Sequence, residues 1–129
     1  MDNDTLVKES HKIISILKKE GHVSLFMLKS LEYDVNDLSL IISSSAYDNL
    51  SKKQALMQLL DILDHHLNEK ILKKIMRITI LKTTDSFVKA INQIFQVTNF
   101  SVTYLNSATI SDIHIENALI LESCQLKPA

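Results

Sequence analysis

The spacing of apolar residues changes near residue 74, and this change constrains the fold more than any other feature of the sequence. From Thr5 to about Lys73, apolar residues recur every three or four positions, which is typical of amphipathic helices. From Ile75 onward, short stretches alternate between apolar and polar residues, which is typical of half-buried strands. We therefore expect an α+β fold, with an N-terminal helical bundle of about four helices (residues 1–73) and a small β-α-β-β-β unit (residues 74–129).

Four helices are expected in the N-terminal part. Gly21 is a stop signal for the first helix. Ser51 and Gln54 have the spacing of a capping box, which predicts the start of the clearest helix. The apolar residues predicted to line one face of that helix are Leu56, Leu60, Leu63 and Leu67, joined by Leu59 and Ile62. The expected ranges are 4–20, 24–31, 36–42, and 51 to an end between 68 and 74.

The C-terminal part is predicted to contain four strands and one helix. Asp85 is a candidate N-cap for the helix, and Asn117 is a candidate turn between the last two strands. An alternative is a long helix that continues through residues 74–81 and replaces the first strand. The expected strands are 76–80, 101–104, 113–115 and 118–121, and the expected helix is 85–95.

Composition excludes several classes of function. Gly21 and Pro128 are the only residues of their types, so glycine-rich phosphate-binding loops cannot be built. Cys124 is the only cysteine, which rules out an intrachain disulfide and a cysteine-based zinc site and favours a reducing compartment. The net charge of −1 argues against nucleic acid as a partner. The N-terminus does not resemble a signal peptide, and no apolar run is long enough to span a membrane.

One constellation could bind a metal ion. Asp61, His65 and Glu69 are spaced four residues apart, so they would share one face of a helix, and their side chains suit zinc or manganese. A metal-dependent enzyme is one hypothesis from this spacing. The alternative is a solvated face with ordinary pairing between successive turns. We expect the alternative, with no metal, no cofactor and no catalytic residues.

The densest basic cluster consists of Lys70, Lys73, Lys74 and Arg77. On a helix these four side chains would form one basic stripe, which could contact an acidic partner. The alternative is a solvated helix end, where cations offset the helix dipole.

Three stretches resemble the delta subunit of rotary ATP synthases, a family that includes the mitochondrial oligomycin sensitivity-conferring protein. Leu38–Leu60 is similar to the stretch where a helix of that family ends and a Lys-rich capped helix begins. Ile75–Val102 is similar to its strand, amphipathic helix and next strand, and Ile115–Cys124 to its closing hairpin. The sequence departs from the family in having Leu121 and Glu122 in place of the usual Asp and Gly, and in a shorter helical part.

The resemblance implies a non-catalytic connector in ATP synthesis and hydrogen ion transport, which links the catalytic head to the peripheral stalk. The helical part would receive a helix of the head in an apolar groove, for which Val7, Ile14, Leu28 and Leu38 are candidates. The protein would then be cytoplasmic or in an organelle matrix, and would reach a membrane only through its partners.

The alternative is a small cytosolic protein-binding module, such as an adaptor or a toxin-neutralising immunity protein. An immunity protein commonly covers an active site with an acidic patch. Four aspartates are available for such a patch in this sequence: Asp34, Asp37, Asp61 and Asp64.

Overall fold

The computed structural model describes residues 3–31 and 34–126 of the chain. Within these ranges the chain forms an α+β fold of four α-helices, one short 3-10 helix and five strands. The helices are α1 (Asn3–Lys18), η1 (Ser45–Tyr47), α2 (Lys52–His66), α3 (Glu69–Leu72) and α4 (Ser86–Ile94). The strands are β1 (Val23–Leu31), β2 (Asp34–Ser44), β3 (Ile75–Leu81), β4 (Thr103–Ile110) and β5 (Ile113–Ser123).

The described strands form one mixed sheet in the order β3-β2-β1-β5-β4. Three pairs of neighbours are antiparallel, and β3 lies parallel to β2. Helices α2 and α3 supply the crossover that a parallel pair requires. The boundary predicted at residue 73 falls between α3 and β3, and the sheet takes strands from both sides of it.

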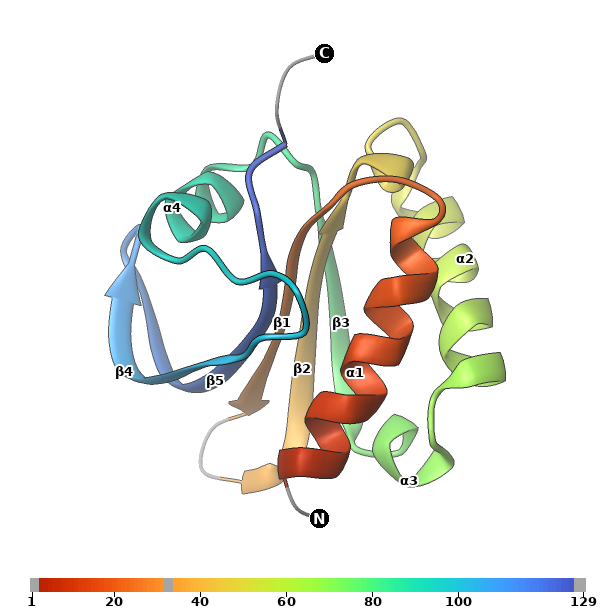
Figure 1. Ribbon diagram of the computed structural model, residues 1–129, viewed down its shortest axis with the longest axis horizontal. Coiled ribbons are helices and arrows are strands. Elements are labelled where there is room, and N and C mark those ends of the chain that lie inside the picture. Colours follow the sequence, from red (N-terminus) through yellow and green to blue (C-terminus); the bar gives the residue numbers. More distant parts are fainter. Residues whose placement is uncertain (1–2, 32–33, 127–129) are drawn as a thin grey trace.

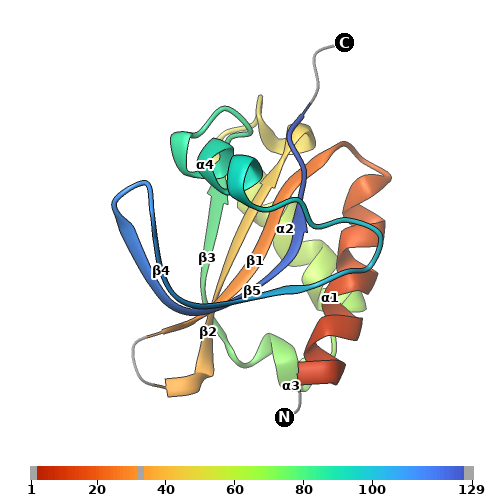
Figure 2. The ribbon, with the colours of Figure 1, turned by 60° about the vertical axis from the view of Figure 1, so that its left-hand side comes forward.

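Helices α1 and α2 cover one face of the sheet, while α4 lies on the other face (Figure 1). The β4–β5 hairpin bends away from the other strands, so that its tip rises on the side of α4 (Figure 2). Each face therefore has its own core. The residues Leu17, Leu40, Ile42, Leu59 and Leu63 belong to the core under α1 and α2. The residues Leu25, Met27, Ile91, Ile115 and Ile120 belong to the core under α4.

The predicted N-terminal helical bundle is wrong, because residues 23–44 form the β1–β2 hairpin. In β1, Phe26 and Leu28 enter the core under α1, while Leu25 and Met27 enter the core under α4. A strand that is buried on both faces reads as a continuous apolar run, which periodicity alone does not distinguish from a buried helix. The connection between the helices predicted at residues 24–31 and 36–42 lies partly outside the described residues.

The predicted capping box at the start of α2 is confirmed. The Ser51 side chain accepts a hydrogen bond from the Gln54 backbone N–H, and the Gln54 side chain accepts one from the Ser51 N–H. Helix α2 ends at His66, because Leu67 adopts an extended backbone with φ −90° and ψ 141°. Asn68 then caps the single turn of α3.

The C-terminal elements follow the prediction more closely. The strand predicted at residues 76–80 is present as β3, which runs from Ile75 to Leu81, and the helix capped by Asp85 is confirmed. The predicted turn at Asn117 is wrong, because β5 continues through it and Asn117 pairs with Asn106 of β4. The predicted β-α-β-β-β unit is therefore wrong as well, since the described residues from Ile75 on form β-α-β-β. The apolar run at residues 118–121 lies between β1 and β4, as expected of a central strand.

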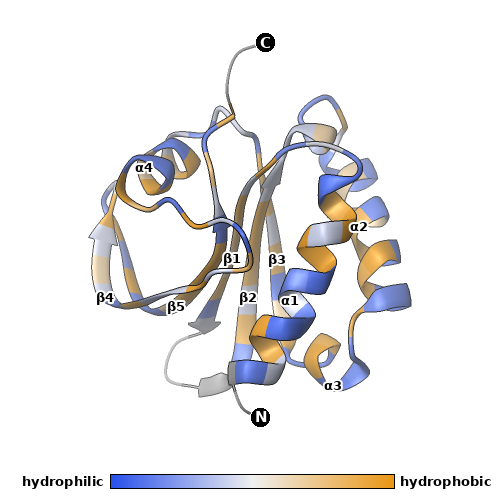
Figure 3. Ribbon diagram, in the orientation of Figure 1, coloured by the Kyte–Doolittle hydropathy of each residue, from blue (hydrophilic) through white to orange (hydrophobic). Residues whose placement is uncertain are grey.

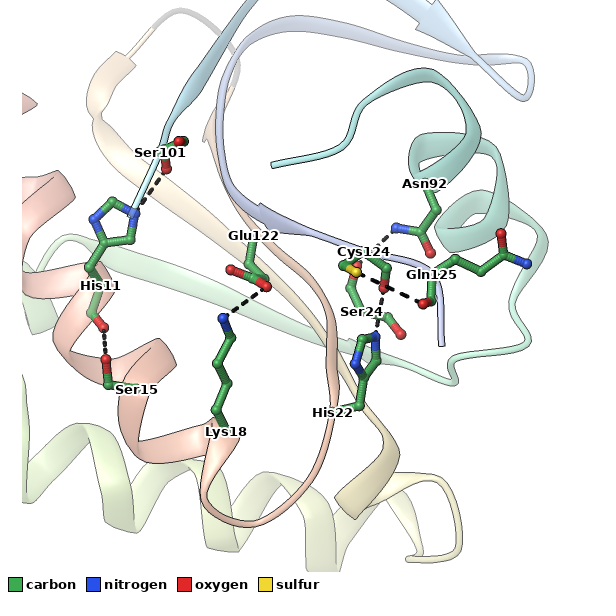
Figure 4. Close-up of polar contacts among 10 residues, drawn as sticks. All are labelled: His11, Ser15, Lys18, His22, Ser24, Asn92, Ser101, Glu122, Cys124 and Gln125. Atoms are coloured by element: carbon green, nitrogen blue, oxygen red, sulfur yellow. Dashed lines mark hydrogen bonds and ion pairs between the residues drawn. The ribbon is translucent and has the colours of Figure 1, made fainter. Parts of the chain in front are cut away.

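Polar contacts fasten the end of β5 to its surroundings (Figure 4). Lys18 Nζ lies 3.1 Å from Glu122 Oε2, whose side chain is only 4% exposed. Asn92 of α4 donates hydrogen bonds to the Ser24 carbonyl and to Ser123 Oγ, both at 2.9 Å. These contacts join both helical layers to the centre of the sheet.

Candidate functional site

A groove of about 610 Å³ follows β3 along the margin of the sheet. Leu56 of α2 forms one side of it, and Ile78 and Ile80 of β3 form the other. Asp48 fixes the loop that follows β3. Its carboxylate accepts hydrogen bonds from the backbone N–H of Thr83, at 2.9 Å, and from the Thr83 hydroxyl. We call this feature the β3-edge groove.

The exposed apolar residues of α2 extend this groove. Leu56 is 37% exposed, Met57 60% and Leu60 39%, and Leu60 is a neighbour of both other positions on the helix surface. Helix α2 runs antiparallel to β3 (Figure 1), so Leu60 lies one turn closer than Leu56 to the start of β3, where Met76 is 56% exposed. Figure 3 shows hydrophobic residues on more than one side of α2.

The prediction of one buried leucine face on α2 is therefore only partly right. Leu59 and Leu63 are buried, together with Ala55. Leu56 and Leu60 lie outside the core, next to the β3-edge groove. The sequence did contain a signal for this exposed side, because the apolar stripe of α2 is wider than a helix needs for packing on one face.

Strand β3 is a free edge, since no described strand pairs with its outer side. Such an edge presents unpaired backbone N–H and C=O groups to solvent. The opposite edge of the sheet, β4, is less suited to pairing, because Ser107 has a φ of 59° and the hairpin bends.

The charges around the β3-edge groove are mainly positive. Lys52 and Lys82 line the groove, and Lys53 is exposed beside Lys52. Among the described residues, none of these three lysines forms an ion pair. Asp85 is the carboxylate in the lining, and its Oδ1 accepts the N-terminal hydrogen bond of α4 from the Phe87 N–H at 2.8 Å.

The four residues of the predicted basic cluster surround the start of β3. Lys70 is in α3, Lys73 and Lys74 follow α3, and Arg77 is exposed in β3. Lys73 Nζ lies 3.4 Å from Glu69 Oε1. The cluster spans a helix, a connection and a strand, so it does not form the predicted stripe along one helix.

The apolar residues predicted to line a partner groove are parts of the main core. Ile14, Leu28 and Leu38 are buried, and Val7 is half-buried against the same cluster. The prediction assumed a helical bundle with an open groove. In the sheet fold these side chains pack between α1, β1 and β2.

The residues of the predicted metal constellation do not converge. His65 donates a hydrogen bond from Nδ1 to the Asp61 carbonyl at 2.8 Å, and this bond and the nearby Asp61 carboxylate raise the pKa of His65. Glu69 belongs to α3, because α2 ends before it. In the part of the chain that the structure describes, no group of three or more His, Cys, Asp or Glu residues could hold a metal ion.

The aspartates that could form an acidic patch lie on different elements. Asp61 and Asp64 are exposed on α2, whereas Asp37 is half-buried near the start of β2. The Asp34 side chain lies outside the described residues.

The thiol of Cys124 has no histidine partner among the described residues. Its Sγ donates to the Gln125 carbonyl at 3.9 Å, and His22 Nε2 donates to the Cys124 carbonyl oxygen at 2.7 Å (Figure 4). His114 Nε2 lies 2.8 Å from Glu116 Oε1.

None of the protein-family models, curated proteins or solved structures compared with the chain matches it. None of the described helices combines the length and the apolar composition needed to cross a membrane.

Proposed function

We propose that this chain is a non-catalytic protein-binding module, and that the β3-edge groove receives an extended segment of its partner. The observation that carries the proposal is the coincidence of a free strand edge with exposed apolar side chains of the neighbouring helix. A segment that added to β3 would form main-chain hydrogen bonds with the edge. Every second side chain of that segment would face Leu56, Ile78 and Ile80.

The charge of the groove favours an acidic partner. Lys52, Lys53 and Lys82 are exposed at one end of β3. Acidic side chains that flank an apolar strand would complement these cations, which would speed association and fix the register of binding.

The structure supports this general role better than the stalk connector role. The connector hypothesis expected a helical bundle to receive a helix of the catalytic head, and the β1–β2 hairpin occupies that part of the chain. The immunity-protein form of the hypothesis rested on an acidic patch, whereas the charges around the β3-edge groove are mainly positive. We therefore propose an adaptor-like module for an acidic, extended segment.

A displayed library of extended peptides, selected on the immobilised protein, tests this function. We expect enrichment of peptides in which acidic residues flank a stretch with an apolar residue at every second position. Binding should protect amide protons of β3 from hydrogen exchange, as strand addition requires. The affinity of a selected peptide should fall about tenfold or more in Leu56→Glu, since a carboxylate would replace a central apolar contact.

Matched variants separate binding at the groove from general effects of charge. Gln58→Glu places the same charge on the exposed side of α2, and Lys19→Glu reverses a charge at the end of α1. Both should leave the peptide affinity within about twofold of wild type. Equal losses in Gln58→Glu and Leu56→Glu, or exchange protection only at β4, would contradict the proposal.

A further inference from the structure

A second hollow, of about 390 Å³, opens on the side of the sheet that faces α4. Strands β1, β2 and β3 form its floor, and the first residues of α4 form one wall. The opposite wall is the tip of the β4–β5 hairpin, which bends toward α4 (Figure 2). The volume lies within the range of pockets that bind small molecules. We call it the α4-side pocket.

Three polar residues form a row across its floor. Lys29 of β1 pairs directly with Ser39 of β2, and Ser39 pairs directly with Arg77 of β3. Residues in register on one face of a sheet are separated by one strand spacing, so the Lys29 and Arg77 backbones are about 10 Å apart, on either side of Ser39. Ser39, which lies between the two cations, has a small side chain and is itself buried.

The next row along the strands is mainly apolar. Met27 pairs with Ile41, and both are buried in the core under α4. Phe87 of α4 and Ile115 of β5 are buried members of the same core and also line the pocket. The α4-side pocket therefore has a cationic end and an apolar floor.

The two cations have no anionic partner among the described residues. Neither Lys29 nor Arg77 forms an ion pair there. Lys29 is half-buried in the central strand, where a charge without a partner is unfavourable. Asp85 lines the pocket, but its carboxylate accepts the capping hydrogen bond from the Phe87 N–H.

We propose that the α4-side pocket binds a small organic anion, in which a carboxylate is attached to a short apolar body. The planar fork of Arg77 matches the geometry of a carboxylate, and Lys29 would contact it from the other side. The apolar body would lie over Met27, Ile41 and Ile115. An inorganic anion would leave this apolar floor exposed, and a neutral lipid would leave both cations without partners.

Titration with octanoate, followed by amide chemical shifts, tests the proposal. Octanol supplies the apolar body without the charge, and inorganic phosphate supplies the charge without the apolar body. We expect saturable octanoate shifts in β1, β2 and the hairpin tip. Octanoate should also raise the melting temperature of the protein, since it would bind the folded state alone. Octanol and phosphate should bind at least about tenfold more weakly, because each satisfies one half of the pocket.

Charge-removal variants locate the site. Arg77→Gln and Lys29→Gln should each weaken octanoate binding about tenfold, the usual effect of losing a charge-assisted hydrogen bond. Lys89→Gln removes an exposed charge of α4 outside the pocket lining and should not change the affinity. The proposal is overturned if octanoate does not bind, if octanol or phosphate binds equally well, or if the three variants behave alike. It is independent of the protein-binding role, since its contacts lie on the α4 side of the sheet.

Discussion

Tyr47 shows how a single residue can work against the stability of this fold. The residue is buried beside the end of β2, and its hydroxyl has no hydrogen-bond partner among the described residues. Burial, together with the nearby charge of Glu20, raises the pKa of Tyr47 to about 12. A buried hydroxyl without a partner costs free energy that an apolar ring of the same shape does not.

We predict that Tyr47→Phe leaves the free energy of unfolding at neutral pH unchanged, or raises it by up to about 1 kcal/mol. The ring still fills the core, and the unpaired hydroxyl is removed. Urea unfolding followed by far-UV circular dichroism measures this difference. A loss of more than about 1 kcal/mol would mean that the hydroxyl has a stabilising partner.

The raised pKa also predicts that wild type and Tyr47→Phe differ in how their stability depends on pH. In the unfolded chain a tyrosine ionises near pH 10, whereas folded Tyr47 ionises near pH 12. The folded state thus binds the Tyr47 proton more tightly than the unfolded state does. The stability that comes from this difference is fully present below about pH 10 and is lost as the pH rises toward 12. Wild type should therefore lose more stability than Tyr47→Phe over this interval.

At the scale of elements, the connection between α1 and β1 depends on the absence of a side chain. A Cβ at Gly21 would lie 2.8 Å from Ser45 Oγ and 3.0 Å from the Ala46 backbone nitrogen. Ser45 Oγ also accepts a hydrogen bond from the His22 N–H at 2.9 Å, so η1 is fixed close to this connection. The sequence identified Gly21 as a helix stop but could not show this second, tertiary reason for a glycine.

We predict that Gly21→Ala lowers the free energy of unfolding by about 1–3 kcal/mol, because the added methyl group overpacks this contact. Ser45→Ala removes the nearest atom, so the double variant should lose less than the sum of the two single losses. Thermal unfolding of the four proteins in this cycle measures the coupling. Additive losses would show that the methyl group added in Gly21→Ala does not clash with the Ser45 hydroxyl.

The elements differ in how well sequence predicts them. Helix α2 begins where Ser51 and Gln54 place it, because a capping box is a local signal. Strand β1 was mistaken for a helix, because its partners β2 and β5 cover both edges and helices cover both faces. Only the tertiary arrangement distinguishes these two interpretations of a continuous apolar run.

The candidate sites show the same limit. Arg77 was identified from the local density of basic residues, whereas Lys29 was not, since it stands alone in the sequence. Their arrangement depends on the register of β1, β2 and β3, which joins residues 29, 39 and 77. No local pattern specifies that register, because β1 and β2 contribute apolar side chains to the cores on both faces of the sheet, so apolar alternation does not distinguish the faces.

At the scale of the whole molecule, the sheet makes the two halves of the chain depend on each other. Residues 1–73 contribute β1 and β2, and residues 74–129 contribute β3, β4 and β5. The central strand β1 lies between β2 of its own half and β5 of the other. Helix α4 packs on β1, so the core under α4 also combines both halves.

We predict that the chain unfolds in one cooperative transition, and that fragments 1–73 and 74–129 are each unfolded when separate. The first fragment would expose the α4-facing side chains of β1 and β2, and the second would have β3 without a neighbouring strand. Circular dichroism and dispersion of amide chemical shifts measure the fragments, and coincident transitions by two probes measure cooperativity of the full chain. A mixture of the fragments should regain strand signal, because the pairs β2–β3 and β1–β5 can form only between them. A dispersed spectrum from either fragment alone would show instead that the boundary near residue 73 separates two independently folding units.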